Sequence, residues 1–130
     1  KENIRLIFTE CDRLLRADGL MAFLLDYQDH YSYFDKGISV YNFLQYSDKA
    51  WVFFNPALHY QNRLRHRDYL DLLNEGGVDL VEEKRNEGTE TDLKNLEKLH
   101  LEKGFKEYSL TELAVRNAHI VVRKKDNVLL

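Results

Sequence analysis

The chain has 130 residues, of which 44% are hydrophobic and 32% charged, a size and balance typical of one small globular domain. A net charge of −3 gives no reason to expect a nucleic-acid partner, and no apolar run approaches the roughly 18 residues of a membrane span. We expect no signal peptide, because the charged start leads straight into an amphipathic pattern. The single cysteine, Cys11, excludes an internal disulfide, so the reducing cytoplasm is the expected compartment.

The first part of the chain predicts a helix, a tight turn and a strand. Apolar residues recur at helical spacing from Ile4 to Leu15, and Asp18-Gly19 then breaks the pattern. Gly19 suits the left-handed conformation that often ends a helix. The continuous apolar run from Leu20 to Leu25 is typical of a strand buried on both faces, as at the centre of a parallel sheet. Together these elements make half of a βαβ unit.

An aromatic segment follows the predicted strand. Residues 27–69 hold 12 of the 16 aromatic side chains of the chain, together with three of its five histidines. Two short helices are predicted there, over residues 38–46 and 48–54. The stretch is too long for a plain connector, and long structured insertions are often lids or binding loops. We assign residues 27–66 to a helical, aromatic-rich insert that caps a substrate.

The rest of the chain predicts helices and strands in alternation. The predicted elements are a helix from Arg67 to Asn74, a strand over residues 78–82, a helix from Asp92 to Leu99, a short helix opened by the capping box at 109–112, and a strand from Ala118 to Arg123. The polar residues 85–91 predict a loop. Such alternation indicates an α/β layered sheet, in which the last strand can lie beside the strand at 20–25 or at an edge.

Several of these segments resemble one family. Residues 7–20 resemble the helix, turn and strand that follow the cofactor pocket of class I S-adenosylmethionine-dependent methyltransferases, with Ala17-Asp18-Gly19 in place of the family's Pro-Gly-Gly. Residues 68–82 resemble the helix that enters the sixth strand of that fold. Residues 118–124 resemble its final antiparallel strand, which is inserted beside the fifth. Residues 26–64 are similar to an insert found in a bacterial subset of these enzymes.

The resemblance implies a fold and an activity. Residues 1–130 would be a partial domain, the C-terminal half of a Rossmann-like methyltransferase sheet, in an enzyme that transfers a methyl group from S-adenosylmethionine to a small-molecule acceptor. The sequence has no G-x-G stretch, so the half that binds the cofactor is expected to lie outside this chain. The chain alone is therefore expected to be inactive.

Candidate site residues follow the predicted strand, because ligands of open α/β sheets bind beyond the carboxyl ends of the strands. An acceptor often has to lose a proton, and imidazole accepts one near neutral pH, so His30 or His59 is the candidate general base. Arg63 could bind an acidic group of the acceptor. The residues expected to contact the acceptor are Asp26, Tyr27, Tyr31, Tyr41, Trp51, Tyr60, Asn62 and Arg63.

Other interpretations remain open for these residues. Each histidine can instead be a surface or structural residue, the aromatic side chains can be the core of a small lid, and Arg63 can be a solvated charge. His30, His59, His66, Asp29 and Asp35 could supply metal ligands, although their spacing matches no common pattern.

Two alternatives concern the function of the whole chain. A nicotinamide-dependent enzyme would share the sheet architecture. A non-catalytic, self-associating α/β interaction module would form a homodimer through an exposed sheet edge.

Overall fold

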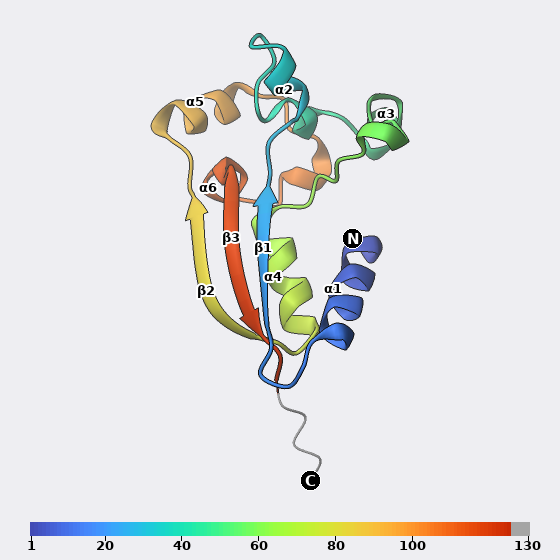
Figure 1. The fold of residues 1–130 in the computed structure, drawn as a ribbon. Coiled ribbons are helices and arrows are strands. Elements are labelled where there is room, and N and C mark those ends of the chain that lie inside the picture. Colours follow the sequence, from blue (N-terminus) through green and yellow to red (C-terminus); the bar gives the residue numbers. More distant parts are fainter. Residues whose placement is uncertain (126–130) are drawn as a thin grey trace. The chain divides into compact units, whose positions relative to one another are not determined.

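The computed structural model describes residues 1–125 (Figure 1). Its contacts divide the chain into two compact units. The sheet unit comprises residues 1–26, 64–86 and 117–125, and the helical unit comprises residues 27–63 and 87–116. None of the helices in the described part of the chain has the length and apolar character needed to cross a bilayer.

The sheet unit contains three strands in the order β1-β3-β2. The strands are β1 (Leu20–Asp26), β2 (Asp79–Asn86) and β3 (Asn117–Arg123). β3 is antiparallel to both neighbours, so β1 and β2 run in the same direction on either side of it. The predicted α/β class is therefore confirmed, and the last strand occupies the central position.

Helices α1 (Glu2–Leu14) and α4 (His66–Glu75) pack in the sheet unit, as Figure 1 shows. The Phe8 ring of α1 lies 4.8 Å from the Phe23 ring of β1 and 6.3 Å from the Tyr69 ring of α4, measured between centroids. Burial alternates along β1 and along β3, and buried Met21 pairs with buried Val122. One face of the sheet and the apolar stripes of two helices thus form the core of this unit.

The prediction that the strand at 20–25 is buried on both faces is wrong. Leu20 and Leu24 are 54% and 86% exposed, whereas Met21 between them is 8% exposed. Within residues 1–125, β1 is an edge strand, and its helical neighbours contact only the face that carries Met21 and Phe23. A continuous apolar run has the same sequence pattern whether one face or both are covered.

Two local expectations are also corrected. At the turn before β1, Asp18 has the positive φ of 57°, and Gly19 does not adopt the left-handed conformation expected of it. Gly19 is needed for space instead, because a Cβ there would lie 2.8 Å from the carbonyl oxygen of Arg16. The loop predicted from Arg85 begins later, since β2 continues to Asn86 through its pairing with β3.

The helical unit consists of short helices joined by loops. They are α2 (Tyr31–Phe34), η1 (Asn42–Gln45), α3 (Asp48–Phe54), η2 (Ala57–His59), α5 (Glu90–Lys98), η3 (Lys103–Phe105) and α6 (Leu110–Ala114). Their buried core contains Tyr41, Phe43, Leu44, Trp51, Leu96, Leu113 and Ala114. This core draws on both segments of the unit.

Sequence patterns predicted some of these helices and not others. The helix over 48–54 is confirmed, and the Ser47 side chain caps it by accepting from the Ala50 N–H (3.2 Å). The helix predicted over 38–46 is wrong, because only the 3₁₀ turn η1 forms there. Ser39 Oγ accepts from the Tyr41 N–H (3.2 Å), and the Val40 carbonyl accepts from the Asp29 N–H (2.7 Å), so loop contacts take backbone groups that a helix would use.

Candidate functional site

The two candidate bases lie side by side in the helical unit. The centroids of the His30 and His59 rings are 5.7 Å apart, with an edge-to-face angle of 72°. Tyr33 stacks on His30 at 5.6 Å, and Phe34 approaches His59 at 6.1 Å. The structure therefore brings together the two histidines that the sequence placed in one site.

A buried carboxylate fixes the segment that carries His30. Asp29 has no exposed surface. Its Oδ1 accepts from the Tyr31 N–H (2.9 Å), and its Oδ2 accepts from Nδ2 of Asn42 (3.1 Å). These bonds orient the first turn of α2, at whose N-terminus His30 lies.

Gln61 connects the segment of His59 to that of His30. Its Oε1 accepts from the His30 N–H (3.1 Å), and its backbone pairs in both directions with the Asn55 side chain, at 2.8 and 3.0 Å. The loop that includes His59 is thus closed by Asn55 and attached to the backbone of His30. Asp29, Asn55 and Gln61 are positioning residues. The sequence interpretation considered Asp29 only as a possible metal ligand and did not identify Asn55 or Gln61.

The histidine pair is accessible, and aromatic rings lie beside it. His30 is half-buried and His59 is exposed. Phe34 is 80% exposed and Tyr60 is 63% exposed. Exposed aromatic rings can bind a flat apolar molecule, and a neutral imidazole can accept a proton from it. This arrangement suits deprotonation of an aromatic or apolar acceptor.

Other predicted contact residues are buried in the helical unit. Tyr41 and Trp51 are 1% and 6% exposed. The Tyr41 hydroxyl donates to the Ala114 carbonyl (3.0 Å), and the Trp51 ring meets the Phe43 ring edge-on. These side chains form the core of the unit, which is the lid-core interpretation left open by the sequence.

The remaining predicted residues differ in their surroundings. Tyr27 is 2% exposed, Asn62 is half-buried, and Asp26 is the exposed last residue of β1 in the sheet unit. Tyr31 is half-buried, and its hydroxyl donates to the Phe54 carbonyl (2.6 Å). Of this group, Tyr31 contacts the histidine pair directly, because its ring lies 6.2 Å from that of His59.

Arg63 contacts the chain itself. Its Nη1 donates to the carbonyl oxygens of Phe43 (2.9 Å) and Tyr46 (2.5 Å), and its Nη2 pairs with Asp48 (2.5 Å). The guanidinium also lies over the rings of Trp51 and Phe105, 5.5 and 5.1 Å from their centroids. The geometry therefore gives Arg63 a structural role, and its expected contact with an acidic group of an acceptor stays a prediction.

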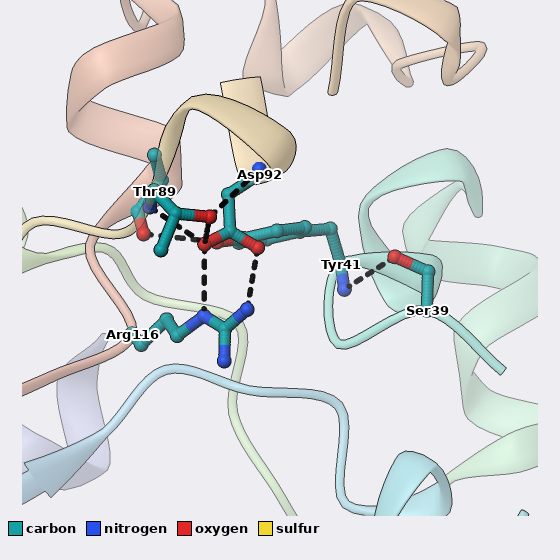
Figure 2. A network of polar contacts seen from close by, with 6 residues as sticks. Ser39, Tyr41, Thr89, Asp92 and Arg116 are labelled. Carbon is teal, nitrogen blue, oxygen red and sulfur yellow. Dashed lines mark hydrogen bonds and ion pairs between the residues drawn. The ribbon is translucent and has the colours of Figure 1, made fainter. Parts of the chain in front are cut away.

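A second polar cluster was missed by the sequence interpretation (Figure 2). Asp92, 2% exposed, pairs with Nε and Nη2 of Arg116 at 3.2 and 2.5 Å. It also accepts from the N–H (2.7 Å) and the hydroxyl (2.9 Å) of Thr89. The spacing Thr89-x-x-Asp92 is a capping-box pattern, so half of this cluster had a sequence signal.

The cluster perturbs the pKa values of its members. Burial by itself raises the pKa of Asp92, but the hydrogen bonds from Arg116 and Thr89 outweigh burial and hold that pKa below its ordinary value. The hydrogen bond to Asp92 raises the pKa of Arg116, and burial raises the pKa of the Tyr41 phenol. Asp92 and Arg116 are therefore a stable ion pair at neutral pH.

Metal and cofactor sites were assessed from the residues present. Among residues 1–125, no three His, Cys, Asp or Glu side chains are placed to hold a metal ion. The doublet Gly76-Gly77 follows α4, and the four other glycines are isolated, so residues 1–125 form no glycine-rich strand–loop–helix cradle for a nucleoside cofactor. The chain therefore offers S-adenosylmethionine no cradle of this kind, and the expectation that the cofactor binds outside the chain stays a prediction.

The chain was compared with known proteins in three ways. No family model, no curated protein and no solved structure matches it. The function is therefore inferred from the geometry of the chain's own residues and from the resemblance of its segments.

Proposed function

We propose that the chain is the acceptor-side part of an S-adenosylmethionine-dependent methyltransferase that acts on a small molecule. The observation that carries this proposal is the sheet order β1-β3-β2, with β3 antiparallel to both neighbours. The resemblance implies this position for the final strand, beside the fifth. The insertion of the last strand between its two neighbours fits the methyltransferase plan better than that of a nicotinamide-dependent enzyme, so the strand order favours the methyltransferase.

In this proposal the cofactor is bound by residues outside the chain and supplies the methyl group. The chain binds the acceptor against the exposed aromatic rings around His30 and His59. One imidazole nitrogen of this pair accepts the proton that the acceptor's O–H or N–H group loses. Asp29 and Gln61 fix the backbone beside the two rings, whose centroids are 5.7 Å apart, so one bound molecule can contact both.

Substitution in the full-length protein tests the role of the pair. We expect His30→Gln or His59→Gln to lower kcat by about 10²- to 10⁴-fold, the usual contribution of a general base. The matched control is His100→Gln, because His100 is exposed and lies outside the pair. Loss of the acidic limb of the pH–rate profile in one variant would identify the base. Full activity in both variants would remove the pair from the mechanism.

Cofactor binding tests the proposed division of the enzyme. Calorimetry with S-adenosylhomocysteine is expected to show no micromolar binding to residues 1–130 alone, and micromolar binding to a protein that includes the residues encoded upstream. A micromolar Kd for the 130-residue chain would contradict this division. The absence of a glycine-rich strand–loop–helix from the upstream sequence would contradict the proposal that the protein is a methyltransferase.

A self-associating interaction module is the second candidate function, and the exposed face of β1 favours it. Leu24 is 86% exposed and Leu20 is 54% exposed on an edge strand, a surface that tends to pair with another chain. Sedimentation distinguishes the candidates. A dimer that Leu24→Glu converts to a monomer would support the module, and a monomer at high concentration would exclude it.

A further inference from the structure

A cavity in the helical unit lies apart from the residues of the histidine pair. Its volume is about 450 Å³, within the range of sites that bind small molecules. It is lined by the loop 36–41, by one side of α5 and by Arg116. Neither His30 nor His59 belongs to its lining.

The charge of this cavity is positive. Lys36, Lys98 and Arg116 line it, against the single carboxylate of Asp92. That carboxylate is already bound by Arg116 and Thr89, as Figure 2 shows. No carboxylate among residues 1–125 forms an ion pair with Lys36 or Lys98. Lys36 Nζ donates one hydrogen bond to the Ser32 carbonyl (3.5 Å), so its remaining N–H groups and the Lys98 ammonium are available to an external anion.

Arg116 gives the cavity a fixed cation. Its Nε and Nη2 face Asp92, so Nη1 is the guanidinium nitrogen that does not contact this carboxylate. Because the pair is held in place by the capping box of α5, the guanidinium is preorganised before any ligand arrives. Preorganisation lowers the conformational cost of binding.

The remaining lining fits the apolar and hydrogen-bonding parts of an organic molecule. Ile38, Val40 and Leu99 supply half-buried apolar surface. Ser39 Oγ accepts from the Tyr41 N–H, which leaves its own O–H free to donate. A simple ion would leave the apolar surface unused.

We propose that this cavity binds a small organic anion, with a phosphate or carboxylate group held by Lys36, Lys98 and Arg116 and an apolar body against Ile38, Val40 and Leu99. The site is separate from the proposed proton-transfer pair, and it does not depend on methyl transfer. Phosphate monoesters and carboxylates are both anions. A dianion is attracted more strongly than a monoanion by three cations, so we expect a phosphate monoester to bind more tightly than a carboxylate.

Three probes of similar shape test the proposal: phenyl phosphate, benzoate and neutral benzamide. Binding to the full-length protein is followed by the amide resonances of the loop 36–41 and of α5. We expect phenyl phosphate to bind more tightly than benzoate, and benzamide not to bind. Benzoate as the tighter ligand would assign the site to carboxylates and overturn the preference for a dianion. Equal binding of benzamide, or no binding of either anion, would overturn the anion site.

A matched pair of charge reversals places the binding in the cavity. Lys98→Glu is expected to weaken phenyl phosphate binding by about tenfold or more, the effect of losing a charge-assisted contact. Lys94→Glu makes the same change of net charge on an exposed part of α5 outside the cavity, and should change the Kd less than about twofold. If both substitutions weaken phenyl phosphate binding equally, the anion is attracted by the net charge of the protein and is not bound in the cavity. An unchanged Tm in both variants confirms that folding is not the cause.

Discussion

Replacing Asp92 by asparagine keeps the shape of the side chain but removes the negative charge to which Arg116 and Thr89 donate hydrogen bonds. An asparagine at this position has one acceptor oxygen, and its amide nitrogen would face N–H donors of Arg116 or Thr89. The substitution therefore loses the hydrogen bonds from either Arg116 or Thr89, and the new amide N–H faces the N–H of the residue that has lost its acceptor. Because Asp92 is 2% exposed, water cannot readily replace the lost partner.

The magnitude follows from the contacts. Loss of a helix cap costs about 1 kcal/mol. The pair with Arg116 is a charge-assisted bond, but the Arg116 side chain is 33% exposed, so solvent screening reduces its contribution to about 1 kcal/mol. The expected loss for Asp92→Asn is about 2 kcal/mol, which corresponds to a shift of about 1 M in the urea midpoint.

The single tryptophan provides the assay. Trp51 lies in the core cluster of the helical unit together with Leu96 of α5, so its fluorescence reports the unfolding of this unit. The control is Glu97→Gln, an exposed carboxylate on the same helix, whose midpoint should move by less than about 0.2 M. A shift below about 0.3 M for Asp92→Asn would refute the reasoning.

The pH dependence gives a second check. The pKa of Asp92 is held below its ordinary value, so its contribution is fully present above the pKa of the unfolded chain and is lost as the pH falls through the folded value. The difference between wild type and Asp92→Asn should therefore be constant from pH 7 to pH 5 and shrink below about pH 4. A difference that persists unchanged into acid would contradict an ionic contribution.

Four further substitutions test local features. Gly88 and Gly77 both have positive φ. A Cβ at Gly88 would lie 2.6 Å from the Ala114 oxygen, whereas one at Gly77 would meet no atom within 4 Å. Gly88→Ala should therefore lower the free energy of unfolding in urea by about 3 kcal/mol, and Gly77→Ala by about 1 kcal/mol. Equal costs would contradict the steric argument. Gln61→Ala removes the acceptor of the His30 N–H and should accelerate hydrogen exchange at that amide by about tenfold, from a loss of about 1.4 kcal/mol; unchanged exchange would show that another group fixes the loop. A lysine at position 63 lacks the planar fork that donates to the carbonyl oxygens of Phe43 and Tyr46 and to Asp48 together. Arg63→Lys should therefore destabilise the unit by about 2 kcal/mol, measured by Trp51 fluorescence. An unchanged stability would show that the guanidinium is not required.

The positions of β1 and β3 were predictable from the sequence, that of β2 only in its first half, and the order of the strands only in part. Apolar and β-branched runs mark β1 and β3 locally. The pairing of Leu20 with Arg123 joins segments at opposite ends of the chain, and no local pattern carries that information. The same limit explains the incorrect two-sided burial of β1, because Leu20 and Leu24 are as apolar as the buried Met21 between them.

The candidate site shows a similar division. The clustering of aromatic residues and histidines in one segment predicted that His30 and His59 belong together. The contacts that bring the rings together come from Asp29, Asn55 and Gln61, polar residues whose sequence pattern fits a surface loop equally well. Only their burial, at 0% exposure for Asp29 and 6% for Gln61, distinguishes them. Burial of a polar side chain is set by tertiary packing, which periodicity does not report.

The histidine pair also depends on a segment that contains none of the predicted site residues. Residues 87–116 join the first segment of the helical unit through its core and through backbone bonds. The Glu102 N–H donates to the Leu44 carbonyl (2.9 Å), and the Tyr27 N–H donates to the Arg116 carbonyl (2.9 Å). Tyr27 lies just ahead of Asp29, so the ion pair that holds Arg116 also supports the start of the segment that carries His30. Asp92→Asn should therefore disturb the amide resonance of His30 as well as the stability of the unit, which links the two polar clusters in one measurement.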